Sequence, residues 1–129
     1  MRPVNLFLTE DGVLKLGYYG LITQAECYSI KKTDCYGFRS FAPEVVRGEY
    51  GMHSDVWSFG TTLIEMMGMT PYSEYDNYQV LTLNRIAVLP FDYHDIGSEE
   101  LLDFLENCFI VKVPKRRSVS ELLNVSVMG

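Results

Sequence analysis

The stretch Ser54-Asp-Val-Trp-Ser-Phe-Gly-Thr-Thr-Leu-Ile-Glu-Met-Met-Gly68 decides the fold, because it holds the only tryptophan and the densest apolar run of the chain. Val56 and Ile64 recur at helical spacing, and apolar side chains also populate the other faces. A helix that is apolar nearly all round is a buried helix. Its length of about 13 residues falls short of the ~20 needed to cross a bilayer. Ser54 suits the N-cap and Gly68 the left-handed position after the last turn, so we predict a buried helix between them.

Length and composition predict one compact domain. The chain has 129 residues, of which 47% are hydrophobic, which is enough for a packed core. Seventeen acidic residues against eleven basic ones give a formal net charge of -6. Because nucleic acids and anionic membranes attract basic surfaces, we expect neither as the main partner. The basic run 112–117 is too short to change that expectation.

The three cysteines, Cys27, Cys35 and Cys108, are odd in number and lack the spacing of a zinc site or a disulfide framework. A reducing compartment fits them best. The first residues contain neither a long apolar segment nor a small-residue cleavage site, so we expect no secretory signal. Together these features predict a cytoplasmic protein.

The N-terminal part of the chain has the pattern of a β-hairpin. Residues 4–9 and 13–16 are short β-prone runs, and residues 10–12 between them form a turn signal that ends in glycine. From residue 17 to residue 41 the periodicity disappears, which indicates a long loop. Loops of that length are usually binding segments, lids or switches, with a disordered connector as the alternative.

The rest of the chain predicts helices. Four helical segments are expected: residues 42–47 closed by Gly48, residues 78–86 capped by Asn77, residues 99–109 capped by Ser98, and a short one after the capping box Ser118 to Glu121. A hairpin, a long loop and then helices without returning strands define an α+β fold that is mainly α, a β-hairpin plus a helical bundle.

Five motifs along the chain resemble, in their order, those of the C-terminal lobe of a eukaryotic protein kinase. The motifs are Asn5 with the hairpin, Lys15-Leu-Gly-Tyr-Tyr-Gly20, Ala42-Pro43-Glu44, Asp55-Val-Trp-Ser-Phe-Gly60 and Arg116. The resemblance covers the chain from 1 to 129 as a partial kinase domain without its N-terminal lobe. The sequence around Tyr50 and after Ile64 is most similar to serine/threonine kinases of the sterile-20 and mitogen-activated cascade type.

The resemblance implies structural roles for these motifs. Residues 17–44 become the activation segment, which Ala42, Pro43 and Glu44 terminate. Residues 54–68 become the central helix of the lobe, with Trp57 and Gly60 in its motif.

Two further roles concern charged side chains. Glu44 is expected to pair with Arg116, because the alignment to Arg116 continues without a gap, while Arg117 stands where the family usually has proline. A buried pair of this kind costs roughly 3–5 kcal/mol to break from one side. Asp55 is expected to hold the backbone of the catalytic loop.

The resemblance also implies that most of the catalytic site is missing. The Mg²⁺-binding aspartate of the family corresponds to Tyr18, and a phenol is a poor ligand for a hard cation. Gly20 matches the glycine of the same motif, Asn5 matches the asparagine that holds a metal ion, and Arg2 stands where the family has lysine. The catalytic aspartate would precede Met1. ATP and Mg²⁺ are the cofactors of the family, but we expect no cofactor and assign no catalytic residue in this chain.

Two functions follow from these expectations. The first is a serine/threonine-kinase-like domain, related by descent to ATP-dependent phosphoryl transfer and inactive as given. The second is a pseudokinase-like binding module whose partner is a kinase or a scaffold protein. A weaker third possibility is a longer parent that is active through an unusual metal arrangement built on Asn5. Enzymatic status, oligomeric state, and whether the chain is a fragment or a complete product stay open.

Overall fold

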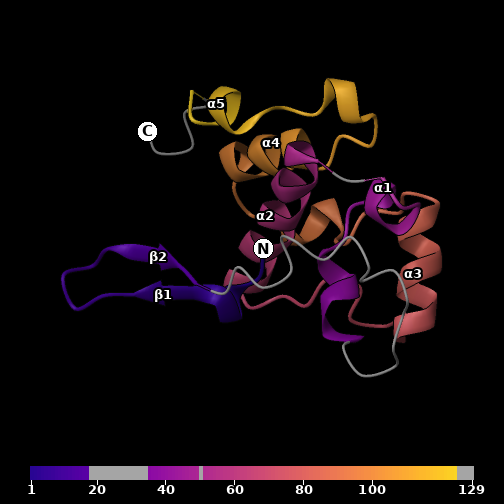
Figure 1. Ribbon diagram of the computed structural model, residues 1–129, viewed down its shortest axis with the longest axis horizontal. Helices are drawn as coiled ribbons and strands as arrows, with labels where there is room; N and C mark the ends of the chain where they lie inside the picture. Colours follow the sequence, from indigo (N-terminus) through magenta and orange to yellow (C-terminus); the bar gives the residue numbers. More distant parts are fainter. Residues whose placement is uncertain (18–34, 50, 125–129) are drawn as a thin grey trace.

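A computed structural model of the chain describes residues 1–17, 35–49 and 51–124. Figure 1 shows a body of helices from which a two-stranded hairpin projects to one side. The elements are β1 (Leu6–Leu8), β2 (Leu14–Leu16), α1 (Pro43–Val46), α2 (Met52–Met66), α3 (Asn77–Arg85), α4 (Glu99–Cys108) and α5 (Val119–Leu122), with 3-10 helices at Pro3–Asn5, Cys35–Ser40, Tyr93–Asp95 and Val113–Lys115. The predicted fold class, α+β and mainly α, is confirmed. No helix in the described ranges is long and apolar enough to cross a membrane.

The hairpin has the predicted turn and an unusually apolar surface. The antiparallel register places Leu6 opposite Leu16, Phe7 opposite Lys15 and Leu8 opposite Leu14. Gly12 adopts a φ of +77°, as the turn signal requires. Because side chains alternate along a strand, the paired leucines share one face. On this face Leu8 and Leu14 are 72% and 59% exposed, and on the opposite face Phe7 is 57% exposed, so the described residues leave the apolar side chains of the hairpin largely uncovered.

Helix α2 lies at the centre of the core, as predicted. Trp57 is fully buried, and its ring meets the ring of Phe109 edge-on, with centroids 4.9 Å apart. Much of the buried face consists of small polar side chains: the hydroxyl of Ser58 donates to the Ser40 carbonyl at 2.8 Å, for example. At its C-terminal end the prediction of burial on all faces is wrong, because Met66 is exposed.

The start of α2 differs from the prediction, whereas its end agrees. Gly51 is the N-cap and the helix begins at Met52, so Ser54 lies inside the first turn. The Ser54 hydroxyl accepts the Gly51 N–H at 3.2 Å and donates to the Glu44 carboxylate at 2.9 Å. The Ser54 hydroxyl therefore serves the cap from the third helical position, and the boundary was predicted three residues too late. Gly68, with a φ of +83°, follows the last turn as expected.

The other helices follow their predicted caps with one exception. Gly48 closes α1, Ser98 caps α4 through the Leu101 N–H, and Ser118 with Glu121 caps α5. Helix α3 is capped by Asp76 rather than Asn77, because the Asp76 carboxylate accepts the Gln79 N–H at 2.9 Å. The predicted long loop contains the 3-10 helix Cys35–Ser40, and its residues 18–34 lie outside the described part of the chain.

Gly60 allows α2 to approach the end of α4 closely. A Cβ atom added at Gly60 would lie 2.8 Å from Phe109 Cζ and 3.0 Å from Cys108 Cβ. Real Cβ atoms rarely tolerate such contacts, and both neighbours belong to the core. The glycine is therefore required by packing at this position.

We predict that Gly60→Ala lowers the free energy of unfolding by about 1–3 kcal/mol, because the methyl group overpacks the core. Gly97→Ala is the matched control, since a Cβ atom there meets nothing within 4 Å. Urea unfolding followed by the fluorescence of Trp57 measures both. Equal midpoints for the two variants would contradict the close approach.

Candidate functional site

Glu44 and Arg116 form a buried ion pair between α1 and the segment that follows α4. Arg116 Nη1 lies 2.5 Å from Glu44 Oε1, and Nη2 lies 3.0 Å from Oε2. Both residues are 2% exposed. This two-pronged arrangement is the geometry in which an arginine holds a carboxylate most specifically. It joins residues 72 positions apart in the sequence and thereby fixes the end of the predicted activation segment.

The remaining hydrogen-bonding groups of the pair also find partners. Arg116 Nε donates to the Ile110 carbonyl at 2.8 Å, and Nη1 also donates to the His53 carbonyl at 2.9 Å. The guanidinium carbon lies 5.1 Å from the centroid of the Trp57 ring, a cation–π contact. Because buried charges are costly unless fully hydrogen-bonded, these contacts are what makes the pair tolerable inside the protein.

The ionisation of Glu44 depends on these contacts. Burial alone raises the pKa of the Glu44 carboxyl group, but hydrogen bonds from Arg116, from its own backbone and from Ser54, together with the charge of Arg116, outweigh that effect. The pKa of Glu44 therefore lies below its ordinary value, and the group is ionised at neutral pH.

The residues before α1 are fastened to α3 and to the loop that precedes it. The Arg39 guanidinium donates to the carbonyls of Pro71, Tyr72 and Tyr75 at 2.8, 2.5 and 2.8 Å. On α3, Asn84 donates to the Phe38 carbonyl at 2.9 Å and accepts the Tyr72 hydroxyl at 2.6 Å. The segment 38–44 is thus held by side chains at both ends, Arg39 with Asn84 at one and Glu44 at the other.

Sequence reasoning missed this second network. Asn84 carried a usable signal, because it follows the buried Val80 by four residues and so lies on the same face of α3. A polar side chain on a buried face is almost always hydrogen-bonded. Arg39 carried no such signal, since its partners are backbone carbonyls that any sequence would offer.

The start of the chain lies against α2. The 3-10 turn Pro3–Asn5 contacts this helix, and the Asn5 carbonyl accepts the Gly17 N–H at 2.8 Å. Burial lowers the pKa of the Met1 amino group, and the nearby carboxylate of Asp55 offsets this in part. Asp55 is exposed on the first turn of α2 and faces the residues that precede the hairpin.

The described residues do not fit a magnesium nucleotide. Mg²⁺ requires near-octahedral coordination by oxygen atoms, usually with one or two carboxylates. Asn5 offers one amide oxygen, and within the described ranges no group of three or more His, Cys, Asp or Glu side chains could hold a metal ion. Tyr18 and Gly20, the other expected cofactor positions, lie outside the described residues. The structure thus gives the position of Asn5 and leaves the other expected metal ligands outside its described ranges.

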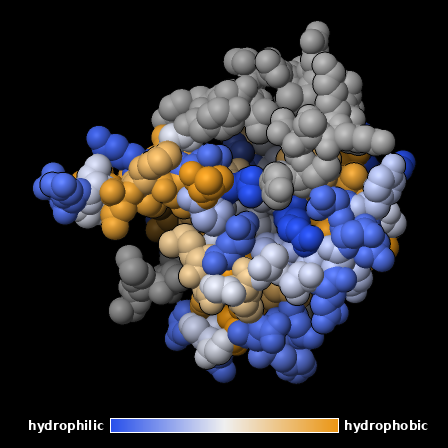
Figure 2. Space-filling model, turned by 90° about the horizontal axis from the view of Figure 1, so that it is seen from below, coloured by the Kyte–Doolittle hydropathy of each residue, from blue (hydrophilic) through white to orange (hydrophobic). Residues whose placement is uncertain are grey.

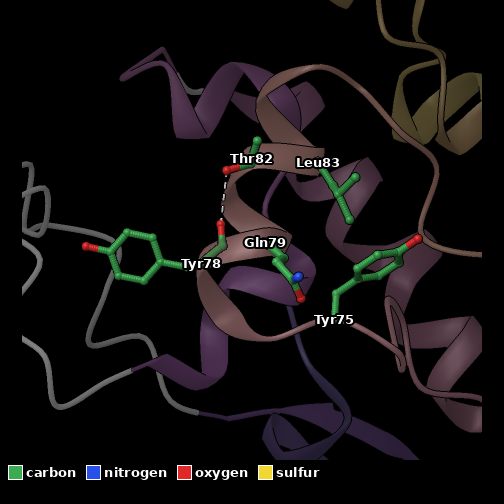
Figure 3. A pocket seen from close by; sticks show the side chains of 5 residues that line it. All are labelled: Tyr75, Tyr78, Gln79, Thr82 and Leu83. Carbon is green, nitrogen blue, oxygen red and sulfur yellow. Dashed lines mark hydrogen bonds between the residues drawn. The ribbon is translucent and has the colours of Figure 1, made fainter.

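A shallow groove beside α3 is a second candidate surface (Figure 3). It is lined by Tyr75, Tyr78, Gln79, Thr82 and Leu83. The Thr82 hydroxyl donates to the Tyr78 carbonyl at 3.1 Å, while the Tyr78 ring points away from Tyr75 and Leu83. These side chains include no carboxylate, imidazole, thiol or amine, so the groove offers no acid–base catalyst near neutral pH.

Comparison with known proteins identifies the class. The family model for the protein kinase domain matches residues 1–128, and the chain belongs to that family. It is 35% identical over 128 residues to the serine/threonine-protein kinase STE20 of Saccharomyces cerevisiae. The aligned region covers 96% of this chain and 14% of that protein.

Two further relatives have similar identities. The G2-specific protein kinase nim-1 of Neurospora crassa is 29% identical over 133 residues, with 99% of this chain and 15% of that protein covered. The mitogen-activated protein kinase kinase kinase 1 of Arabidopsis thaliana is 32% identical over 130 residues, with 96% and 21% covered. The chain therefore spans between 14% and 21% of the length of these three relatives.

We predict that Glu44→Gln lowers the free energy of unfolding by about 3–5 kcal/mol at neutral pH, because it leaves Arg116 buried without a counter-charge. Glu106→Gln, at an exposed position of α4, is the control and should change little. Urea unfolding at a series of pH values measures both.

The pH dependence of this difference follows from the lowered pKa of Glu44. Its stabilisation is complete above the ordinary carboxyl pKa of about 4.3 and is lost as the pH falls through the lower folded-state value. The gap between wild type and Glu44→Gln should therefore close in acid. A gap that stays constant as the pH falls through that range would contradict the assignment.

Proposed function

We propose that this chain is the C-terminal-lobe part of a serine/threonine protein kinase domain and that it transfers no phosphate as it stands. Phosphoryl transfer depends on holding the nucleotide, the metal and the acceptor hydroxyl together. The observation that carries the proposal is the donor set: a phenol, Tyr18, stands at the carboxylate position of the family, and Asn5 is left as a single amide ligand. Membership in the kinase domain family supports the descent.

The exposed hairpin supports the assignment to one lobe of a larger domain. In Figure 2 the hydrophobic side chains gather on the projecting hairpin, apart from its hydrophilic tip. Leu8 and Leu14 lie opposite each other there and are both exposed. An apolar surface of this kind is normally covered by other protein. The small share of each relative that this chain spans agrees with a longer parent in which further chain covers it.

The alternative is a binding module that regulates a kinase or a scaffold protein. The observation that favours it is the contrast between the two halves of the site. The structural pair Glu44–Arg116 and the core around Trp57 are intact, whereas the metal-binding position has become Tyr18. A folded lobe without metal chemistry can still bind proteins, and the acidic balance of the chain favours a protein partner in the cytoplasm over nucleic acid or membrane.

A thermal-shift titration tests the proposal. Ligand binding to the folded state raises its apparent stability by RT ln(1 + [L]/Kd). For the 129-residue chain we predict no rise in melting temperature with ATP, with or without Mg²⁺. For Tyr18→Asp we expect no rise either, because one restored carboxylate still leaves the phosphates unbound.

Two results together would overturn the proposal. They are a Mg²⁺-dependent rise in the melting temperature of the wild-type chain and transfer of labelled phosphate from ATP to a generic serine-containing peptide. Omitting Mg²⁺ controls for binding of the nucleotide alone.

A further inference from the structure

We propose that a groove between α1 and the segment after α4 binds an acidic peptide segment of a partner protein. The groove has a volume of about 440 Å³ and is lined by Arg47, Glu49, Val111, Lys112, Val113, Pro114 and Lys115. We call it the basic groove. The inference deepens the binding-module alternative, since it names a surface and a class of partner. It rests on the groove itself and not on the loss of phosphoryl transfer.

The buried ion pair holds the two walls of the basic groove together. On one wall, the N–H groups of Arg47 and Glu49 donate to the Glu44 carbonyl at 3.1 and 2.8 Å. On the other wall, the Arg116 N–H donates to the Lys112 carbonyl at 3.1 Å. The side chains of Glu44 and Arg116 join the two segments beneath. A groove built on a buried pair is already formed before a partner arrives, which reduces the entropy lost on binding.

The charge of the basic groove is opposite to that of the chain. Arg47, Lys112 and Lys115 are exposed and cationic, and Glu49 is the one carboxylate in the lining, so three positive charges and one negative charge leave a formal +2. The whole chain carries -6. Among the described residues the ion pair Glu44–Arg116 is the only salt bridge, so the three cations have no carboxylate partner there. Complementary charge therefore favours an acidic partner and repels a basic one.

The neighbouring arginines do not add to this surface. Arg116 is buried beneath it, and Arg117 Nε donates to the Asn107 side chain at 2.9 Å on the other side of the segment. The basic run 112–117 therefore contributes only two lysines to the groove, Lys112 and Lys115. From the sequence alone this run was too short to indicate the class of partner.

The apolar part of the lining distinguishes a peptide from a simple polyanion. Val111, Val113 and Pro114 share the lining with the cations, and Val111 is 37% exposed. Apolar side chains together with charged ones are usual in a protein-binding patch. It suits an extended peptide in which an apolar residue is flanked by aspartate and glutamate. A nucleic-acid backbone would use the cations and leave the apolar part unused.

Fluorescence anisotropy with the 129-residue chain tests the inference. The probe is a fluorescein-labelled peptide, Glu-Asp-Glu-Leu-Glu-Asp-Glu, in buffer without nucleotide at about 50 mM salt, where screening is moderate. We expect saturable binding that weakens with added salt. Lys112→Glu/Lys115→Glu should weaken it at least about tenfold, because both charges are reversed.

The matched control is Lys15→Glu/Arg85→Glu, which changes the net charge equally at exposed positions on the hairpin and α3. It should stay within about twofold of wild type. Circular dichroism checks that each variant is folded. If the double reversal unfolds, Lys112→Gln/Lys115→Gln replaces it, with an expected loss of about threefold.

Three outcomes would overturn the inference: no binding of the peptide to the folded wild-type chain, equal weakening in the control variant, or tighter binding of a single-stranded RNA oligomer than of the peptide. Replacing the central leucine of the peptide by serine should weaken binding, and unchanged affinity would also contradict the proposed apolar contact. Because the assay contains no nucleotide, its failure leaves the proposed function intact, and phosphate transfer by the chain would leave the basic groove intact.

Discussion

The structure depends on a single buried contact, the bidentate pair between Glu44 and Arg116 above the ring of Trp57. Removing two charges from water costs several kcal/mol per ion, and the hydrogen bonds to Ser54, His53 and Ile110 offset that cost. A buried pair is therefore weak evidence for stability as such. Its consequence here is geometric, because it fixes α1, the start of α2 and the segment after α4 in one arrangement.

That arrangement separates the parts that carry the fold from the parts that would carry chemistry. Segment 38–44 is held by Arg39 at one end and by Glu44 at the other, and both contacts are made by protein groups. A chain of the protein kinase domain family can thus keep this core without relying on a bound metal or nucleotide, which is the physical basis for the proposed binding role.

Local rules predicted the features that neighbouring residues determine. The turn at Gly12, the cap Ser98 and the box at Ser118 followed from patterns of three to five residues. The start of α2 was predicted wrongly because the N-cap is Gly51, which has no side chain to signal it, while Ser54 accepts the Gly51 N–H from the third helical position. The bond of Ser54 to Glu44, ten positions away, has no signal in the sequence spacing.

The pairing of Glu44 with Arg116 could be predicted only from the resemblance to the kinase family, since no local sequence pattern links the two residues. The basic groove could be found only in the structure, because its two walls are more than 60 residues apart in the chain.

A double-mutant cycle with Glu44→Leu and Arg116→Met tests the central claim most directly. Each single change should lower the free energy of unfolding by about 3–5 kcal/mol, because it leaves one buried charge alone. The loss in the double variant should be smaller than the sum of the two single losses by about 1–3 kcal/mol or more. Losses that add to within about 0.5 kcal/mol would show that the two side chains act independently and would contradict this account.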